Sequence, residues 1–138
     1  MAPGSDVRGS ARVWYPAHLE MHARAVIGPG VNVYSMGQIV VGEDALVSQG
    51  AHLCAGTHDY DTPEFQLYSR PIVIGARVWI AAEAFVGPGA RIGDGAVVGA
   101  RAVAFGELQP WTVYSGNPAK AIRARRHPAA GAAQPLKS

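Results

Sequence analysis

The sequence predicts an all-β solenoid of short strands, and three observations support this fold class. Aliphatic residues recur every six positions over much of the chain. A small residue, most often glycine or alanine, directly follows most of them. The 17 glycines and 10 prolines fall largely on this period instead of being scattered. An α-helix needs spacings of three and four, and a half-exposed strand needs alternation, so a strict six favours short strands joined by tight turns.

The repeat is most regular in the second half of the chain. Its inward positions there are Ile74, Ile80, Val86, Ile92, Val98 and Ala104. The frame also runs back through Met21, Ile27 and Val33, slips by two residues at "YSMGQI", and resumes at Val41, Val47 and Leu53. Each hexad should form one short strand with its aliphatic side chain inward, and successive coils should stack about 4.8 Å apart.

The remaining segments lack the six-residue frame and predict the domain organisation. Residues 1–12 are rich in Ala, Pro and Gly, so we expect an N-terminal arm before a β-helix domain over 13–117. The segment "DYDTPEFQLYSRP" cannot be threaded through hexads, which predicts a projecting loop over 57–72. A short C-terminal helix over 118–126 should follow the last coil, whose open end needs a cap, and 127–138 should be a disordered tail.

Composition narrows the class of protein. The chain has 138 residues, 49% of them hydrophobic, and a net charge of +2, which suits one folded domain. Its basic residues gather in "KAIRARR" without interleaved aromatics, so nucleic-acid binding is disfavoured. The single Cys54 excludes an intrachain disulfide, and no signal segment or apolar run of about 18 residues occurs. We therefore expect a cytoplasmic protein without an integral membrane segment.

Residues 13–125, including "IGARVWIAAEAFVGPGARIGDGAVVGA" and "SGNPAKAIR", resemble the hexapeptide-repeat acyltransferases. The chain looks most like the colanic-acid-biosynthesis type of sugar O-acetyltransferase, and more distantly like galactoside and maltose acetyltransferases. The resemblance implies a left-handed parallel β-helix with three hexads per coil. It also implies acetyl-CoA as co-substrate and a homotrimer with active sites between subunits. Three hexads per coil would place four residues at equivalent corners: Asn32, His52, Phe85 and Val103.

His58 is the candidate catalytic residue, because it lies where the repeat is interrupted, in "CAGTHDYD". Acetyl transfer to a hydroxyl needs a base that takes the hydroxyl proton. A histidine with an ordinary pKa near 6.5 suits that task. The resemblance gives this role to the histidine of the matching "THD" segment. Cys54, by contrast, directly follows the inward Leu53, so it is interpreted as a small wall residue and not as a nucleophile.

The acceptor is expected to be a sugar or a glycolipid bound near His58. Asn32 matches an acceptor-binding asparagine of the galactoside group, and Tyr34 lies beside it. Asp59 and Asp61 are candidates for orienting the imidazole or for binding acceptor hydroxyls. His52 is interpreted as a structural or supporting residue.

Coenzyme A needs cations at its phosphate end and a narrow groove for its pantetheine arm. By resemblance, the cofactor-contacting positions are Trp79, Ala82, Ala100, Gly106, Lys120 and Arg123. The sequence departs from galactoside-type enzymes in two places, with Ala81-Ala82 for Gly-Ser and Phe105-Gly106 for Thr-Lys. These changes remove a hydroxyl contact and a cation. No metal is expected.

Two other classes of function fit the same fold. A metal hydratase of the γ-carbonic anhydrase kind would bind zinc through three histidines across a subunit interface, with His52, His58 and His22 as candidates. The spacing of six between His52 and His58 disfavours that reading. A non-catalytic β-helix scaffold is the other alternative, and it would not bind coenzyme A.

Overall fold

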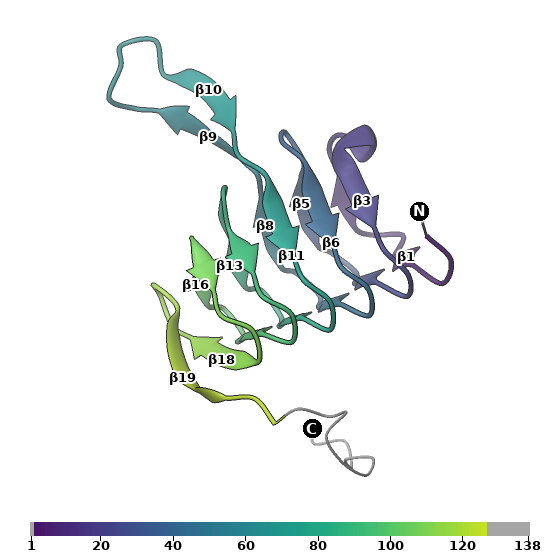
Figure 1. Ribbon diagram of the computed structural model, residues 1–138. Helices are drawn as coiled ribbons and strands as arrows, with labels where there is room; N and C mark the ends of the chain where they lie inside the picture. The colour runs from purple at the N-terminus through teal and green to yellow at the C-terminus, as the bar shows by residue number, and fades with distance from the viewer. Residues whose placement is uncertain (1, 127–138) are drawn as a thin grey trace.

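The computed structural model describes residues 2–126, which wind as one stack of coils (Figure 1). Successive short strands belong in turn to three different sheets, so the stack is a three-sided prism. Within each sheet, neighbouring coils pair in parallel. This arrangement confirms the predicted solenoid of stacked short strands.

The strands of the three sheets can be given in their order along the stack. The first sheet holds Asp6–Val7 (β1), Val26–Ile27 (β4), Leu46–Val47 (β7), Trp79–Ile80 (β12), Val97–Val98 (β15), Thr112–Ser115 (β18) and Lys120–Ala124 (β19). The second holds Arg12–Val13 (β2), Asn32–Tyr34 (β5), His52–Cys54 (β8), Phe85–Val86 (β13) and Val103–Ala104 (β16). The third holds Leu19–Met21 (β3), Ile39–Val41 (β6), Ile72–Ile74 (β11), Arg91–Ile92 (β14) and Glu107–Leu108 (β17).

The core is built from the inward residue of each hexad. Val33, Leu53 and Val86 lie in register on neighbouring strands of the second sheet, and all three are fully buried. Alanines at the corners are buried too, and no larger side chain is needed there because the prism is narrow. At Gly42 even a Cβ atom would lie 2.5 Å from the carbonyl carbon of Gly75 in the next coil. The period of six therefore reports both the burial of aliphatics and the close stacking of backbones.

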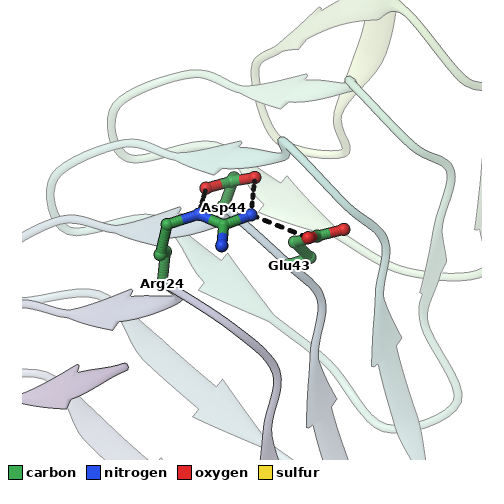
Figure 2. A network of polar contacts seen from close by, with 3 residues as sticks. All are labelled: Arg24, Glu43 and Asp44. Atoms are coloured by element: carbon green, nitrogen blue, oxygen red, sulfur yellow. Dashed lines mark hydrogen bonds and ion pairs between the residues drawn. The ribbon is translucent and has the colours of Figure 1, made fainter. Parts of the chain in front are cut away.

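The turns between the third and first sheets carry charged residues in an unusual backbone conformation. Arg24, Asp44 and Arg77 have φ values of 60°, 59° and 57°, in the left-handed region that favours glycine. The Arg24 side chain connects two neighbouring coils (Figure 2): its Nε donates to Asp44 Oδ1 at 2.7 Å, and its Nη2 donates to Glu43 Oε1 at 2.7 Å. These pairs are exposed and contribute little free energy each.

The predicted projecting loop is a β-hairpin. Gly56–Asp59 (β9) and Gln66–Ser69 (β10) pair in antiparallel register and extend away from the stack (Figure 1). The hairpin leaves the prism after β8 and returns to it at β11, which is the corner between the second and third sheets.

The prediction of an N-terminal arm over 1–12 is wrong, because the first coil already begins at β1. Val7 pairs in register with Ile27, and Val13 pairs with Val33. Val7 and Val13 lie six residues apart, but Val13 lies eight residues before Met21, so the hexad frame slips by two residues there, as it does between Val33 and Val41. A short 3₁₀ turn, Pro16–His18 (η1), then forms the corner before β3.

The prediction of a short C-terminal helix over 118–126 is also wrong. Lys120–Ala124 forms β19, which pairs antiparallel with β18 (Figure 1). The reason is the free edge of β18, whose unpaired N–H and C=O groups are satisfied by an added strand and not by a helix. Arg125 then reaches back, and its Nη1 donates to the carbonyls of Arg77 at 2.9 Å and Gly95 at 3.0 Å. The predicted tail over 127–138 lies outside the described residues.

Candidate functional site

The hairpin presents His58 with a defined proton arrangement. Its Nδ1 lies 2.8 Å from the carbonyl oxygen of Phe65 on the facing side of the hairpin. A carbonyl only accepts hydrogen bonds, so the neutral ring carries its hydrogen on Nδ1 and leaves Nε2 as an acceptor. The side chain is exposed within one chain. His58 therefore offers the nitrogen that a general base requires.

Large apolar side chains surround His58 on the hairpin without being covered. Leu67 lies directly opposite His58 in the antiparallel register. Tyr60 is 77% exposed, and Phe65 and Tyr68 are exposed as well. A two-stranded hairpin has little stability by itself. The hairpin therefore presents an uncovered apolar surface around His58.

Asp59 has a local structural contact. Its Oδ1 accepts a hydrogen bond from the backbone N–H of Asp61 at 3.1 Å, and its carbonyl accepts one from Thr62 Oγ1 at 3.1 Å. Adjacent side chains of a strand point to opposite faces, so Asp59 and His58 face different ways. The imidazole is oriented by the carbonyl of Phe65, a contact that sequence reasoning missed because a main-chain carbonyl leaves no residue signature. The acceptor-binding role of Asp59 stays a prediction.

The second sheet carries the predicted column of Asn32, His52, Phe85 and Val103, and the four residues are in register on neighbouring strands. The His52 ring lies edge-on to Phe85 with 5.2 Å between ring centroids. Partial burial lowers the pKa of His52, because desolvation disfavours the charged imidazolium. His52 is thus held mainly as a neutral ring in an apolar surface.

An aromatic group occupies the first two coils of this sheet. Asn32 Oδ1 accepts a hydrogen bond of 2.7 Å from the indole Nε1 of Trp14. Trp14 also meets Tyr34 edge-on at 5.4 Å, and the Arg12 guanidinium lies 4.9 Å from the Trp14 ring centroid. Trp14 and Arg12 were not among the predicted site residues. They flank Val13, whose pairing with Val33 places them beside Asn32 and Tyr34. The two-residue slip between Val13 and Met21 hid this register in the sequence.

Tyr34 connects this aromatic group to the hairpin. A Cβ atom at Gly56, the first residue of β9, would lie 2.6 Å from a ring carbon of Tyr34. The Tyr34 hydroxyl points at the sulfur of Met36, 3.9 Å away. The two predicted acceptor residues Asn32 and Tyr34 therefore lie on the sheet from which the hairpin with His58 departs.

The predicted cofactor residues fall into two places. Trp79 lies on the first sheet, 44% exposed, and its Nε1 donates to Ser48 Oγ at 2.9 Å. Ala82 and Ala100 follow β12 and β15 at the next corner, and β19 holds Lys120 and Arg123 at the end of the same sheet.

Gly106 is separated from the others. It lies between β16 and β17, at the corner from which the hairpin with His58 leaves. One chain therefore places His58 and most of the candidate cofactor surface on different edges of the prism.

Other chemistry-bearing groups are few in the described part of the chain. Cys54 is half-buried and directs its Sγ to the carbonyl of Gly56 at 3.2 Å. Within residues 2–126 no three His, Cys, Asp or Glu side chains come together as a metal site. No helix in this range is long and apolar enough to cross a bilayer.

Comparison with known proteins agrees with the repeat and with the fold. Residues 71–105 match the family described as bacterial transferase hexapeptide (six repeats). The structure superimposes on a hexapeptide-repeat-containing acetyltransferase from Vibrio cholerae in complex with acetyl-CoA, with a TM-score of 0.85 and 23% identity over 92% of this chain and 71% of that one. It also superimposes on AntD, an N-acyltransferase from Bacillus cereus, with a TM-score of 0.80 and 17% identity over 93% of this chain and 84% of that one. The chain is thus built from hexapeptide repeats that wind as a left-handed β-helix.

Among curated proteins, the chain is similar to the colanic acid biosynthesis acetyltransferase WcaF of Escherichia coli (strain K12). The two are 43% identical over 119 residues, which is 86% of this chain. The chain spans 65% of the length of that relative. The resemblance drawn from the hexads and from "SGNPAKAIR" is confirmed by these matches.

Proposed function

We propose that the protein transfers an acetyl group from acetyl-CoA to a hydroxyl of a sugar or polysaccharide precursor, with His58 as general base. The observation that carries this proposal is the hydrogen bond between His58 Nδ1 and the carbonyl of Phe65. That bond fixes the tautomer and aims an unprotonated Nε2 away from the hairpin backbone. The similarity to WcaF supports the reaction class.

The reaction needs one base that works in both directions. His58 Nε2 removes the proton of the acceptor hydroxyl while its oxygen attacks the thioester carbonyl carbon. The carbon–sulfur bond then breaks, and the coenzyme A thiolate takes the proton back from the imidazolium. The products are an acetyl ester and free coenzyme A, and His58 returns to its starting tautomer. The Phe65 carbonyl stabilises the imidazolium that forms in between.

The first sheet and its corner offer the surface for coenzyme A. Trp79, Ala82 and Ala100 present a ring and small side chains along successive coils, and Lys120 and Arg123 supply positive charge at the end of the stack. Acetyl-CoA occupies the Vibrio cholerae neighbour, and AntD holds coenzyme A with a dTDP-sugar. Gly106, at the other corner, would meet the cofactor from a second direction.

We propose that the protein is a homotrimer, and the separation of these groups supports a site shared between chains. If His58 and the cofactor surface of one chain lie on different edges of the prism, a complete site needs the hairpin of one chain beside the first sheet of the next. The exposed Tyr60, Phe65 and Leu67 supply an apolar hairpin surface for such a contact. We propose that the reaction takes place in the cytoplasm, and the similarity to WcaF supports this location.

The experiment that tests His58 uses two substitutions. His58→Asn keeps an amide N–H where Nδ1 donates to Phe65 but removes the basic Nε2, while His58→Ala removes both. Both should lower turnover by about 10²–10⁴-fold and leave coenzyme A binding unchanged. Turnover is followed as thiol release across nucleotide sugars, free sugars and glycolipids.

Cys54→Ser is the matched control and should retain most of the activity, because a serine hydroxyl can donate to the Gly56 carbonyl that the Cys54 thiol meets. Wild-type turnover in a folded His58→Asn variant would show that another group acts as the base. Acetyl label found on Cys54 would replace direct transfer with a covalent intermediate.

A further inference from the structure

Four residues lie together at the N-terminal end of the second sheet: Arg12, Trp14, Asn32 and Tyr34. Arg12 and Trp14 are exposed, and Asn32 and Tyr34 are half-buried. Arg12 and Trp14 have no role in the function proposed above. We infer that this group of four is a binding subsite for a saccharide ring that carries a negative charge, a carboxylate or a phosphate. The inference rests on the proposed function, because it assigns the subsite to the acceptor of that reaction.

Trp14 is exposed and yet held in place. Its side chain remains 47% accessible, an uncommon state for the largest apolar side chain. The indole N–H is bonded to Asn32 at 2.7 Å and the Tyr34 ring packs edge-on at 5.4 Å. A fixed indole loses little entropy when a ligand stacks on it. The C–H face of a pyranose ring is complementary to the negative face of an aromatic ring.

Arg12 supplies a cation whose charge is not neutralised by the protein. Its guanidinium stacks on Trp14 at 4.9 Å and forms no ion pair with a carboxylate among residues 2–126. Arg24 and Arg101, at two turns of the stack, are by contrast paired with acidic residues. A planar guanidinium next to a stacking surface recognises carboxylate and phosphate groups in bidentate fashion.

Asn32 completes the subsite as a donor. An indole N–H can only donate, so the group facing Trp14 is the amide oxygen, and the amide nitrogen of Asn32 points away from it. That nitrogen makes no hydrogen bond within the described residues and is available to a ring hydroxyl. A cation, an aromatic face and an amide donor therefore lie together on two neighbouring strands.

The position of the group suits an acceptor longer than one sugar. The strand leading to Trp14, β2, lies two strands from β8, from which the hairpin with His58 emerges. Two strand spacings amount to about 10 Å, the length of roughly two sugar units. Trp14 would thus bind a ring remote from the reacting hydroxyl and hold the acceptor in place for His58.

The test uses one sugar ring with three different substituents: methyl galacturonide, galactose 1-phosphate and methyl galactoside. Binding to the intact protein is read from the indole N–H signals of its three tryptophans in ¹⁵N-labelled protein, and Trp14→Phe identifies the Trp14 signal. The Trp14 signal should shift with the anionic sugars at concentrations about tenfold lower than with the neutral one. The two anionic probes show whether a carboxylate or a phosphate is preferred.

Variants separate the parts of the subsite. Arg12→Gln should weaken binding of the preferred anionic probe about tenfold, toward that of methyl galactoside. Trp14→Ala should abolish binding of all three. Tyr15→Ala is the matched control, since Tyr15 is equally exposed but stacks on His18 instead, and it should bind all probes as the wild type does.

Several results would overturn the inference: no shift of the Trp14 signal, equal affinity for charged and neutral sugars, or a change of oligomeric mass in Trp14→Ala, which would make Trp14 a subunit contact. The subsite and the reaction fail separately. His58→Asn should bind the probes normally, so probe binding without acetyl transfer to any acceptor would refute the reaction and leave the subsite standing.

Discussion

His52 is the residue whose titration the fold alters in a way that can be measured. Burial lowers its pKa below the ordinary 6.5, so the folded chain takes up this proton less readily than the unfolded chain. Above pH 6.5 both forms are neutral and His52 has no effect on the pH dependence of stability. As the pH falls below 6.5, the unfolded chain is protonated first, and the free energy of unfolding decreases until the folded form is protonated too.

We therefore predict that the wild type loses stability relative to His52→Gln when the pH is lowered from 7.5 to 5.5. The comparison is made by thermal unfolding of both proteins in the same buffers, so the other histidines contribute equally to the two curves. Parallel curves for the two proteins would mean that His52 titrates alike in the folded and unfolded chains.

Two other residues are each held by a single hydrogen bond. The tautomer of His58 depends on the bond of 2.8 Å to the Phe65 carbonyl, and the position of the Trp14 ring depends on the bond of 2.7 Å to Asn32. Neither bond has a signature in the sequence. One partner is a backbone carbonyl, and the other pair lies 18 residues apart, on strands whose register is known only once the coils are counted.

At the scale of the coil, the limiting dimension is the distance between neighbouring backbones at the corners. Gly42 faces the backbone of Gly75, where an added Cβ would lie 2.5 Å from a carbonyl carbon. Neither chain segment can move without breaking the hydrogen bond between Gly42 N and the carbonyl of Ile74. This is a steric requirement and not one of backbone dihedral angles.

Gly42→Ala is therefore expected to lower the free energy of unfolding by about 2–3 kcal/mol. Gly9→Ala is the matched control, since nothing lies within 4 Å of a Cβ atom there, and it should change stability by less than about 0.5 kcal/mol. Urea unfolding measures both. Similar losses in the two variants would show that the corners are not closely stacked.

The element that most needs support is β19, because it pairs with the stack on one side only. Arg125 holds its end by donating to the carbonyls of Arg77 and Gly95, which belong to turns of successive coils. Its guanidinium also lies 5.4 Å from the ring centroid of Trp111. The strand is thus fastened by one side chain that lies just beyond it.

Arg125→Met keeps the apolar stem over Trp111 but removes both donors. We expect a loss of about 1–2 kcal/mol, with faster amide hydrogen exchange in β18 and β19 and little change in the central coils. The exposed Arg126→Met serves as control and should exchange like the wild type. Unchanged exchange in Arg125→Met would mean that β19 is held by its backbone pairing alone.

For the whole molecule, the sequence was a good guide wherever the repeat decided the structure. Residues such as Ile80 and Val86 could be assigned to the core because a narrow prism has one inward position per hexad, and that period survives in a single sequence. The register of Asn32, His52 and Phe85 followed from counting three hexads per coil.

The predictions failed where the pairing of strands, and not the six-residue repeat, decides the local structure. A segment such as "KAIRA" has ordinary helix-forming residues, and only the open edge of β18 makes it a strand. The glycine and proline around Val7 concealed the first coil in the same way. The site was predictable as a histidine at a break in the repeat, but its partners Phe65 and Trp14 were not, because they depend on the paths of the hairpin and of the first coil.

The assembly is the prediction that concerns the molecule as a whole. Light scattering should give a mass near three times the 14.4 kDa of one chain. Mixing His58→Asn subunits with Ala100→Trp subunits, each inactive alone, should restore part of the activity, because some sites would then combine an intact histidine with an intact cofactor surface. A fully active monomer would contradict the trimer, and a trimer without complementation would place each site within one chain.

A stack of nearly identical coils has no intrinsic length. The hydrogen bonds that join one coil to the next would equally well join the last coil of one molecule to the first coil of another, and repeated addition would give a fibre. In this chain β19 covers the end of the first sheet and runs opposite to every other strand of that sheet. An incoming β1 would meet a strand of the wrong direction. The five residues of β19 thus end the parallel pairing of the first sheet, and a further coil could not continue it there.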